Sequence, residues 1–171
     1  MKLDDSAPDG RFQKILGRPV AGRKLAKPSG LYQLVVRHGA MAYVSGHAPK
    51  IDGTLAVAGK VGDDIDFPKA QEAARLCVVQ CLLSLRREIG SLDHVERVIK
   101  LVGFVNVAPG FLRLPAVVDG ASALLHEVFG NVIGQHARSS MGVAELPDGA
   151  AVVIELVLAL RDDLNGAAIS P

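Results

Sequence analysis

The sequence contains no tryptophan, and its aromatic residues are limited to five phenylalanines and two tyrosines. It also lacks an excess of charge, since 19 Lys and Arg residues against 18 Asp and Glu residues give a formal net charge of +1. A nucleic-acid-binding surface usually combines a basic stripe with aromatic side chains on which bases stack. No run of about 18 apolar residues is present, which is the length that a membrane-spanning helix requires. We therefore expect neither nucleic acid nor a membrane as a partner.

Cysteine is scarce, because only Cys77 and Cys81 are present, four residues apart in "RLCVVQCLLSL". This spacing places both thiols on one face of a helix, where they would form half of a metal site. No further His or Cys lies nearby in the sequence to complete such a site, and the flanking residues are apolar. Free cysteines are among the most buried residue types, so we expect structural thiols, with no metal and no organic cofactor.

The first residues, "MKLDDSAPDGRFQ", are acidic and polar and lack the apolar segment of a secretory signal, so we expect a cytoplasmic protein. A chain of 171 residues is long enough to bury a hydrophobic core within one domain. Residues 1–29 are rich in Gly, Pro and charged residues, and we interpret them as an N-terminal arm with little fixed structure. The domain then spans residues 30–162, and residues 163–171 form a C-terminal tail.

The pattern of apolar residues predicts the element order β-β-(β)-α-β-α-β-β. The clearest helix begins after Asp66, which can cap it, and ends at Gly90, which can adopt the left-handed conformation. A second helix is predicted at residues 114–130. The turn signal "LPDG" at residues 146–149 predicts a hairpin that joins the last two strands. The other predicted strands are residues 32–37, 41–45, 55–57 and 94–108.

Two amphipathic helices and a mainly antiparallel sheet predict an α+β fold in which both helices cover one face of the sheet. The chain offers no further helix for the other face. We therefore expect that face to be covered by other copies of the chain.

Several segments in this order resemble the YjgF-like family, also known as the reactive-intermediate deaminases or Rid proteins. The most specific segment is "ARSSMGVAELP", an Arg-Ser pair followed at a fixed distance by Leu-Pro, and "YVSGH" supports it. The resemblance covers roughly residues 30–160 and is to a divergent branch of the family. It implies a chorismate-mutase-like fold and a homotrimer with ligand clefts between adjacent subunits. In catalytic members the substrates are enamines and imines, which are hydrolysed to a 2-oxo acid and ammonia. Similar sequences have also been described as endoribonucleases (the L-PSP type) or translation inhibitors.

The resemblance implies a role for individual residues. Arg138 matches the arginine that holds the substrate carboxylate, for which a planar guanidinium is well suited. Tyr32 matches a tyrosine that lines the cleft. Ser45 and Gly46 match a backbone turn beside the ligand, and Ser140 would contribute its backbone N–H.

The sequence departs from the family pattern at two further positions. Active deaminases carry a glutamate fifteen positions after the arginine to orient the attacking water, and Val153 stands there. Glu155 lies two residues further along the same strand, so it would project from the same face about 6–7 Å away. Pro109 stands where the family has an asparagine that helps to bind the ligand. Arg138 and Glu155 are therefore the candidate catalytic residues.

The residues alone leave an alternative for Arg138. If the last two strands form a hairpin with Ser140 opposite Glu155, then Arg138 is a diagonal neighbour of Glu155 and can form an internal ion pair with it. Three functions follow from these alternatives: an imine or enamine hydrolase, a protein that binds a small carboxylate-bearing metabolite without catalysis, and a regulatory partner of another enzyme. An Arg138 that is paired with Glu155 favours the third function, and an Arg138 that points into a pocket favours the first two.

Overall fold

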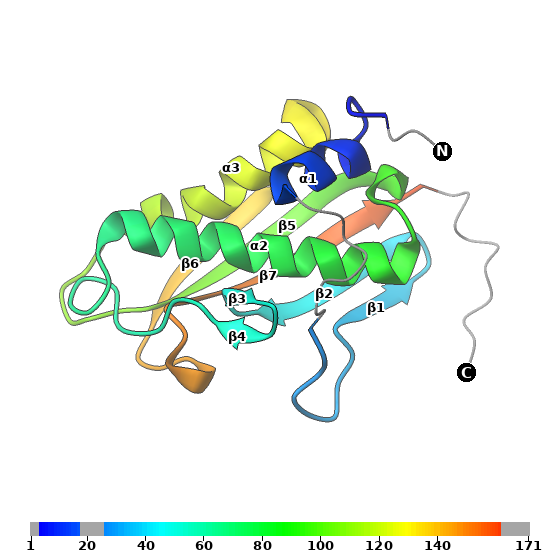
Figure 1. Cartoon of the computed structure of the whole chain (residues 1–171). Helices are drawn as coiled ribbons and strands as arrows, with labels where there is room; N and C mark the ends of the chain where they lie inside the picture. Colours follow the sequence, from blue (N-terminus) through cyan, green and yellow to red (C-terminus); the bar gives the residue numbers. More distant parts are fainter. Residues whose placement is uncertain (1–3, 18–25, 162–171) are drawn as a thin grey trace.

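The computed structural model describes residues 4–17 and 26–161. A five-stranded sheet has the strand order β1-β2-β7-β5-β6, and the two long helices α2 and α3 lie side by side on one of its faces (Figure 1). The elements are α1 (Pro8–Leu16), β1 (Val35–His38), β2 (Met41–His47), β3 (Lys50–Ile51), β4 (Thr54–Leu55), α2 (Phe67–Ile89), η1 (Leu92–His94), β5 (Val95–Asn106), α3 (Leu114–Ile133), β6 (Ala137–Val143), η2 (Pro147–Gly149) and β7 (Val152–Leu160). The predicted α+β fold, with two helices on one face of the sheet, is confirmed. The predicted tail at 163–171 lies outside the described residues.

Helix α2 forms where the sequence predicts it. The side chain of Asp66 accepts a hydrogen bond from the backbone N–H of Lys69 at 2.9 Å, and Gly90 ends the helix with a φ of 85°. Cys77 and Cys81 are fully buried and donate to the backbone carbonyls of Val152 and Ile154 in β7. Burial raises the pKa of both thiols, so both stay protonated and structural, as predicted.

The predicted pairing of the last two strands is wrong. β6 and β7 are not neighbours, because β5 lies between them and pairs parallel with β6 and antiparallel with β7. The physical reason is α3, which carries the chain from the end of β5 back to the start of β6 as a β-α-β crossover and so makes these two strands parallel. The segment around Pro147–Gly149 is a short 3₁₀ turn in a longer connection that leads across β5 to β7.

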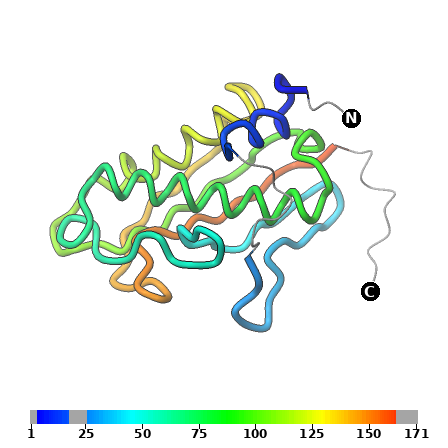
Figure 2. The backbone as a smooth tube through the Cα atoms, viewed as in Figure 1, coloured from blue at the N-terminus to red at the C-terminus, as the bar shows by residue number. Residues whose placement is uncertain are grey.

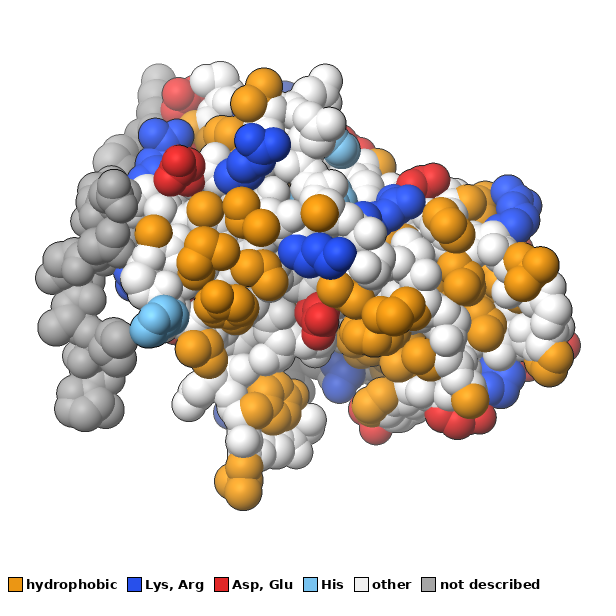
Figure 3. Space-filling view, turned by 180° about the vertical axis from the view of Figure 1, so that it is seen from behind, with side chains coloured by type: hydrophobic (Ala, Val, Ile, Leu, Met, Phe, Trp, Pro, Cys, Tyr) orange, Lys and Arg blue, Asp and Glu red, His pale blue; other side chains and the backbone are white. Residues whose placement is uncertain are grey.

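The two faces of the sheet differ sharply in what covers them. Along β7 the even-numbered residues 152–160 are buried beneath the helices, whereas the odd-numbered residues are partly exposed on the other face. Seen from behind, this open face gathers apolar side chains around a few charged ones (Figure 3). Val36, Tyr43 and Met141 are among its exposed apolar residues. Within residues 4–17 and 26–161, no helix or strand covers this face.

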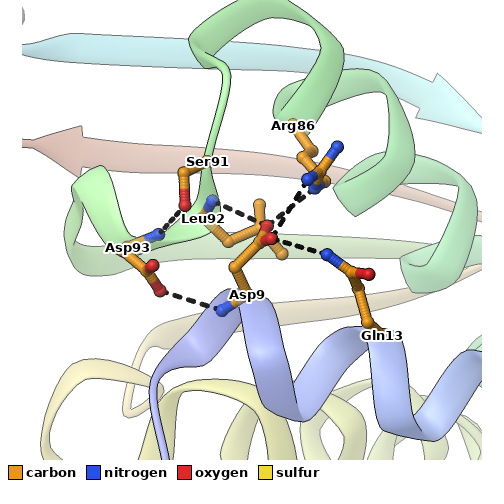
Figure 4. A network of polar contacts seen from close by, with 6 residues as sticks. All are labelled: Asp9, Gln13, Arg86, Ser91, Leu92 and Asp93. Carbon is orange, nitrogen blue, oxygen red and sulfur yellow. Dashed lines mark hydrogen bonds and ion pairs between the residues drawn. The ribbon is translucent and has the colours of Figure 1, made fainter. Parts of the chain in front are cut away.

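The N-terminal segment contains a helix that the sequence analysis did not expect. Helix α1 packs on α3 and η1, and its Phe12 is fully buried. Its Asp9 is also buried and accepts hydrogen bonds from the guanidinium of Arg86, the side chain of Gln13 and the backbone N–H of Leu92 (Figure 4). Phe12 of this helix therefore completes the core, so residues 8–16 of the segment interpreted as an arm pack against the domain.

The regular part of helix α3 ends before Gly130, which has a φ of 77°. The sequence predicted the end of this helix at the same glycine. Among the described residues it is the one helix with the length and composition to cross a membrane. Its apolar side packs on α2 and β5, which is the ordinary position of a core helix.

Candidate functional site

A cavity of about 290 Å³ opens at the end of β2. Most of its wall comes from the loop 26–34, which projects from the sheet (Figure 2), the residues from the end of β2 to β3, and the turn around Pro147. Gln80 of α2 and Val153 of β7 complete the wall. Tyr32 and Gly46, two of the predicted ligand-binding residues, line this cavity together with Val153. The structure thus brings the family's expected glutamate position next to the expected tyrosine and glycine.

Gly46 and Val153 are in close contact across two strands. The register between β2 and β7 shifts between Val44 and His47, so Gly46 lies in a bulge. A Cβ atom at position 46 would lie 2.8 Å from Cγ1 of Val153, which is closer than real Cβ contacts allow. Only glycine fits here, and the pair forms an apolar part of the cavity wall.

The polar groups of this cavity lie around the bulge and at the turn. Lys50 has its Nζ 3.7 Å from Oδ2 of Asp148, and its backbone carbonyl accepts a hydrogen bond from Gln80 at 2.7 Å. Lys27 also lines the cavity, and Asp148 is the one carboxylate among the described lining residues. With two cations against one carboxylate, the cavity favours an anionic ligand.

His47 lies in the same wall, where burial favours its neutral form. Its Nδ1 is 2.6 Å from the carbonyl of Ser45, which can only accept, so Nδ1 carries the proton. Its Nε2 then accepts from the hydroxyl of Ser84 at 2.8 Å. Burial lowers the pKa of His47, which is only 4% exposed.

Ser45 and Glu155 belong to a different cavity. They line a shallow depression of about 250 Å³ on the open face of the sheet, together with Tyr43, Lys100 and other residues of β1, β2, β5 and β7. The hydroxyl of Ser45 donates to the carbonyl of Gln33 at 2.7 Å, and its backbone N–H donates to Leu34. Neither donor of Ser45 is therefore available to a ligand in this arrangement.

Arg138 lies on the opposite face of the sheet from Glu155. It pairs in register with Leu101, which is buried beneath the helices, whereas Glu155 pairs with Val102 on the open face. Nη1 of Arg138 donates to Oδ1 of Asp119 at 2.7 Å and to the hydroxyl of Ser122 at 3.0 Å. The predicted internal partner Glu155 is thus wrong, because the strand register on which it rested does not exist.

Ser140 lies on the same strand two residues further along, opposite Gly103. It is therefore near Arg138 and not near the cavity at β2. Within one chain the predicted site residues fall into three groups: Tyr32 with Gly46, Ser45 with Glu155, and Arg138 with Ser140.

Asp119, Ser122 and Lys50 were not predicted from the sequence. Asp119 and Ser122 are three residues apart in α3, so they face one side of that helix. Nothing in their local sequence marks them, since only the crossover brings them beside Arg138. Among residues 4–17 and 26–161, no group of three His, Cys, Asp or Glu side chains could hold a metal ion.

β2 and β6 are separated by two other strands, β7 and β5. Adjacent strands lie about 4.8 Å apart, so three spacings put Arg138 roughly 14 Å from the strand that carries Gly46. A metabolite of a few carbon atoms cannot reach both residues within one chain.

Comparisons with known proteins agree with this fold. A family model described as "YjgF/chorismate mutase-like, putative endoribonuclease" matches residues 20–159. Protein TCP17 of Trypanosoma cruzi is 39% identical over 137 residues, which cover 80% of this chain and 86% of that protein.

Two solved structures are similar over most of their length. Atu1372 from Agrobacterium tumefaciens, a protein of unknown function, is 37% identical with a TM-score of 0.79, covering 90% of this chain and 92% of that one. A structure described as a "putative endoribonuclease" from Shewanella oneidensis MR-1 is 26% identical with a TM-score of 0.84, covering 91% of this chain and all of the other.

Proposed function

The chain belongs to the YjgF/chorismate mutase-like family, and because it has this family's fold we propose that it binds a small carboxylate-bearing metabolite in a cleft between two copies. The observation that carries the proposal is the separation of Arg138 from the cavity lined by Tyr32 and Gly46. Each copy would then carry both halves of a carboxylate site, but far apart: Arg138 on β6, and the cavity lined by Tyr32 and Gly46 at the end of β2. A neighbouring copy that brings its β6 edge to the cavity would complete the site.

The open face of the sheet supports the association that this requires. Val36, Tyr43 and Met141 expose apolar surface there, and the depression around Glu155 is mostly apolar. Burial of such a surface by identical chains is favourable, and closed symmetric oligomers are the usual result. We propose a homotrimer, in which three copies bury their open faces and form three equivalent clefts.

For chemistry, the proposal is hydrolysis of an imine or enamine to a 2-oxo acid and ammonia. Arg138 would hold the carboxylate, Tyr32 would line the cleft, and water would attack the imine carbon while its proton moves to the nitrogen. Glu155 is the predicted acid or base, and its position on the open face means that it would act across the interface between copies. Lys50 and Asp148 offer a second polar pair at the cavity.

A second candidate is binding without catalysis, and Val153 favours it. The position expected to orient the attacking water contributes only a small apolar side chain, which is packed tightly against Gly46. An anion would still be held by the cations at the cavity, while no group at this position would activate water.

The test is ammonia release from freshly generated 2-iminopropionate and longer imino acids, with calorimetric binding of pyruvate and 2-oxobutyrate in parallel. Wild type is compared with Arg138→Ala, and with Val153→Glu to restore the missing carboxylate. Catalysis that disappears in Arg138→Ala identifies a deaminase. Binding that disappears in Arg138→Ala, with catalysis only in Val153→Glu, identifies a binding protein. Wild type that neither binds these acids nor accelerates hydrolysis disproves the proposal.

A further inference from the structure

The guanidinium of Arg138 has five N–H donors, and only those of one nitrogen are engaged. Nη1 has two hydrogens, and its two acceptors are Oδ1 of Asp119 and the hydroxyl oxygen of Ser122. Within the part of the chain that the structure describes, no acceptor is paired with Nε or Nη2. One edge of the guanidinium, with two parallel N–H directions, is therefore left for another group.

The direction of every hydrogen bond around Nη1 is determined. Nδ1 of His136 lies 2.6 Å from the carbonyl of Gly134 and must donate to it, so Nε2 of His136 is an acceptor. Ser122 accepts from Arg138 and gives its own proton to this Nε2, which lies 3.0 Å away. Burial lowers the pKa of His136, and the neighbouring Arg138 acts in the same direction, so the ring stays neutral. The hydrogen bonds therefore start at Nη1, which donates to Asp119 and Ser122, and continue from Ser122 through His136 to the carbonyl of Gly134.

These contacts add little to the stability of the fold. The side chain of Asp119 is 60% exposed and that of Arg138 is 24% exposed, and ion pairs in contact with water contribute on the order of 0–1 kcal/mol. What the contacts do determine is geometry. Two acceptors three residues apart on α3 fix the plane of the guanidinium and its rotation about the Nε–Cζ axis.

We infer that Asp119 and Ser122 are positioning residues that reserve the Nε/Nη2 edge of Arg138 for a planar, two-oxygen group of the ligand, namely its carboxylate. This inference rests on the proposed binding of a carboxylate by Arg138. The fork of two N–H groups matches the two oxygens of a carboxylate in a bidentate contact. Because α3 holds the fork in place before the ligand arrives, little side-chain freedom is lost on binding.

The experiment is calorimetric binding of 2-oxobutyrate to the full chain carrying Asp119→Ala, Asp119→Asn or Ser122→Ala, beside wild type and Arg138→Ala. Asp119→Ala should weaken binding by about tenfold, because a freely rotating guanidinium must be ordered by the ligand itself. Asp119→Asn should recover most of the loss, since its amide oxygen accepts the same hydrogen bond. Ser122→Ala should fall between wild type and Asp119→Ala. The melting temperature should stay within about 2 °C of wild type in all three.

Glu127→Ala is the matched control. Glu127 lies on the same helix and forms a similarly exposed ion pair with Arg75, at 2.6 and 2.7 Å, so its loss should leave binding unchanged. If Arg138→Ala abolishes binding while Asp119→Ala binds as wild type or more tightly, the positioning role is wrong and carboxylate binding by Arg138 stands. If neither wild type nor Arg138→Ala binds 2-oxobutyrate, the proposed function fails and this inference fails with it.

Discussion

The two faces of the sheet show how much of this molecule one chain completes on its own. On the helix face, strand β7 buries Val152, Ile154, Leu156, Leu158 and Leu160 under α2 and α3. On the open face the same strand presents Val153, Glu155 and Val157 to depressions lined by partly exposed residues. The first face is a finished core, and under the proposed homotrimer the second is the surface that other copies cover. On that proposal, alternate residues of β7 serve stability and assembly.

The largest effect should come from the core side of β7. Leu158→Ala removes a fully buried side chain beneath the helices, so the free energy of unfolding should fall by about 2–5 kcal/mol. Val157→Ala, one residue away on the open face, should cost clearly less in dilute protein. Urea unfolding at low concentration measures both. Equal losses would mean that the two faces do not differ in the way described.

The second largest loss of stability is expected where Asp9 of α1 contacts Arg86 of α2 and Leu92. Replacement of this buried carboxylate by Ala leaves Arg86 without its partner and should cost roughly 2–3 kcal/mol, measured by urea unfolding. Asp93→Ala is the control, because it removes only one acceptor at the same junction and should cost less.

Asp9 also predicts a dependence on pH. Burial acts to raise its pKa, but hydrogen bonds from Arg86, Gln13 and Leu92 outweigh this, so the net pKa lies below its usual 3.8. A depressed carboxyl pKa stabilises the fold above the unfolded value, and this contribution is lost as pH falls through the folded value. Wild type should therefore lose its advantage over Asp9→Asn below about pH 4. An advantage that persists unchanged in stronger acid would contradict this.

A smaller effect is expected on the open face and in a different quantity. Tyr43→Glu places a charge on a residue that is 47% exposed in the single chain, so the monomer should unfold almost as wild type. Association should weaken by roughly 1–2 kcal/mol per copy if this face is the contact between copies. Sedimentation equilibrium measures it, and Ala123→Glu on the exposed side of α3, across the sheet from the open face, serves as the control. Unchanged association in Tyr43→Glu would remove the open face as the contact.

The smallest effect is the titration of His47. Its folded pKa is lowered from 6.5, because burial disfavours the charged ring, so neutral His47 stabilises the fold above the unfolded value. As pH falls from about 6.5 towards the folded pKa, this stabilisation should decline and then level off. His47→Gln should flatten this part of the stability curve. NMR titration of the ring protons reports the pKa directly.

Local signals in the sequence were sufficient for the elements whose structure depends on their own residues. Asp66 and Gly90 mark the two ends of α2, because capping depends on residues that are close in the sequence. The hairpin of β1 and β2 follows from the short connection between them. The family resemblance, carried by the segments around Tyr43 and Arg138, was sufficient for the fold. Pairing between β6 and β7 was not predictable from "LPDG", because a turn signal does not say how far the chain travels before the next strand.

The family resemblance named candidate site residues, but their arrangement in space was not predictable from the sequence. Tyr32 and Gly46 do meet at one cavity, with Val153 beside them. The partners of Arg138 come from α3, nineteen and sixteen residues earlier in the chain, and only the crossover places them there. Helix α1 was not predicted for a similar reason, since Arg86 and Leu92, which donate to Asp9, and the core around Phe12 are distant in the sequence.

The two strands that stand between β2 and β6 have a consequence for genetics. Under the proposed shared cleft, an Arg138→Ala chain keeps an intact cavity, and a chain whose cavity is blocked at Gly46 keeps an intact arginine. Mixed oligomers of these two chains would contain clefts in which both halves are sound. Two alleles that are each defective alone would then complement one another in the same cell, whereas two alleles with defects in the same half would not.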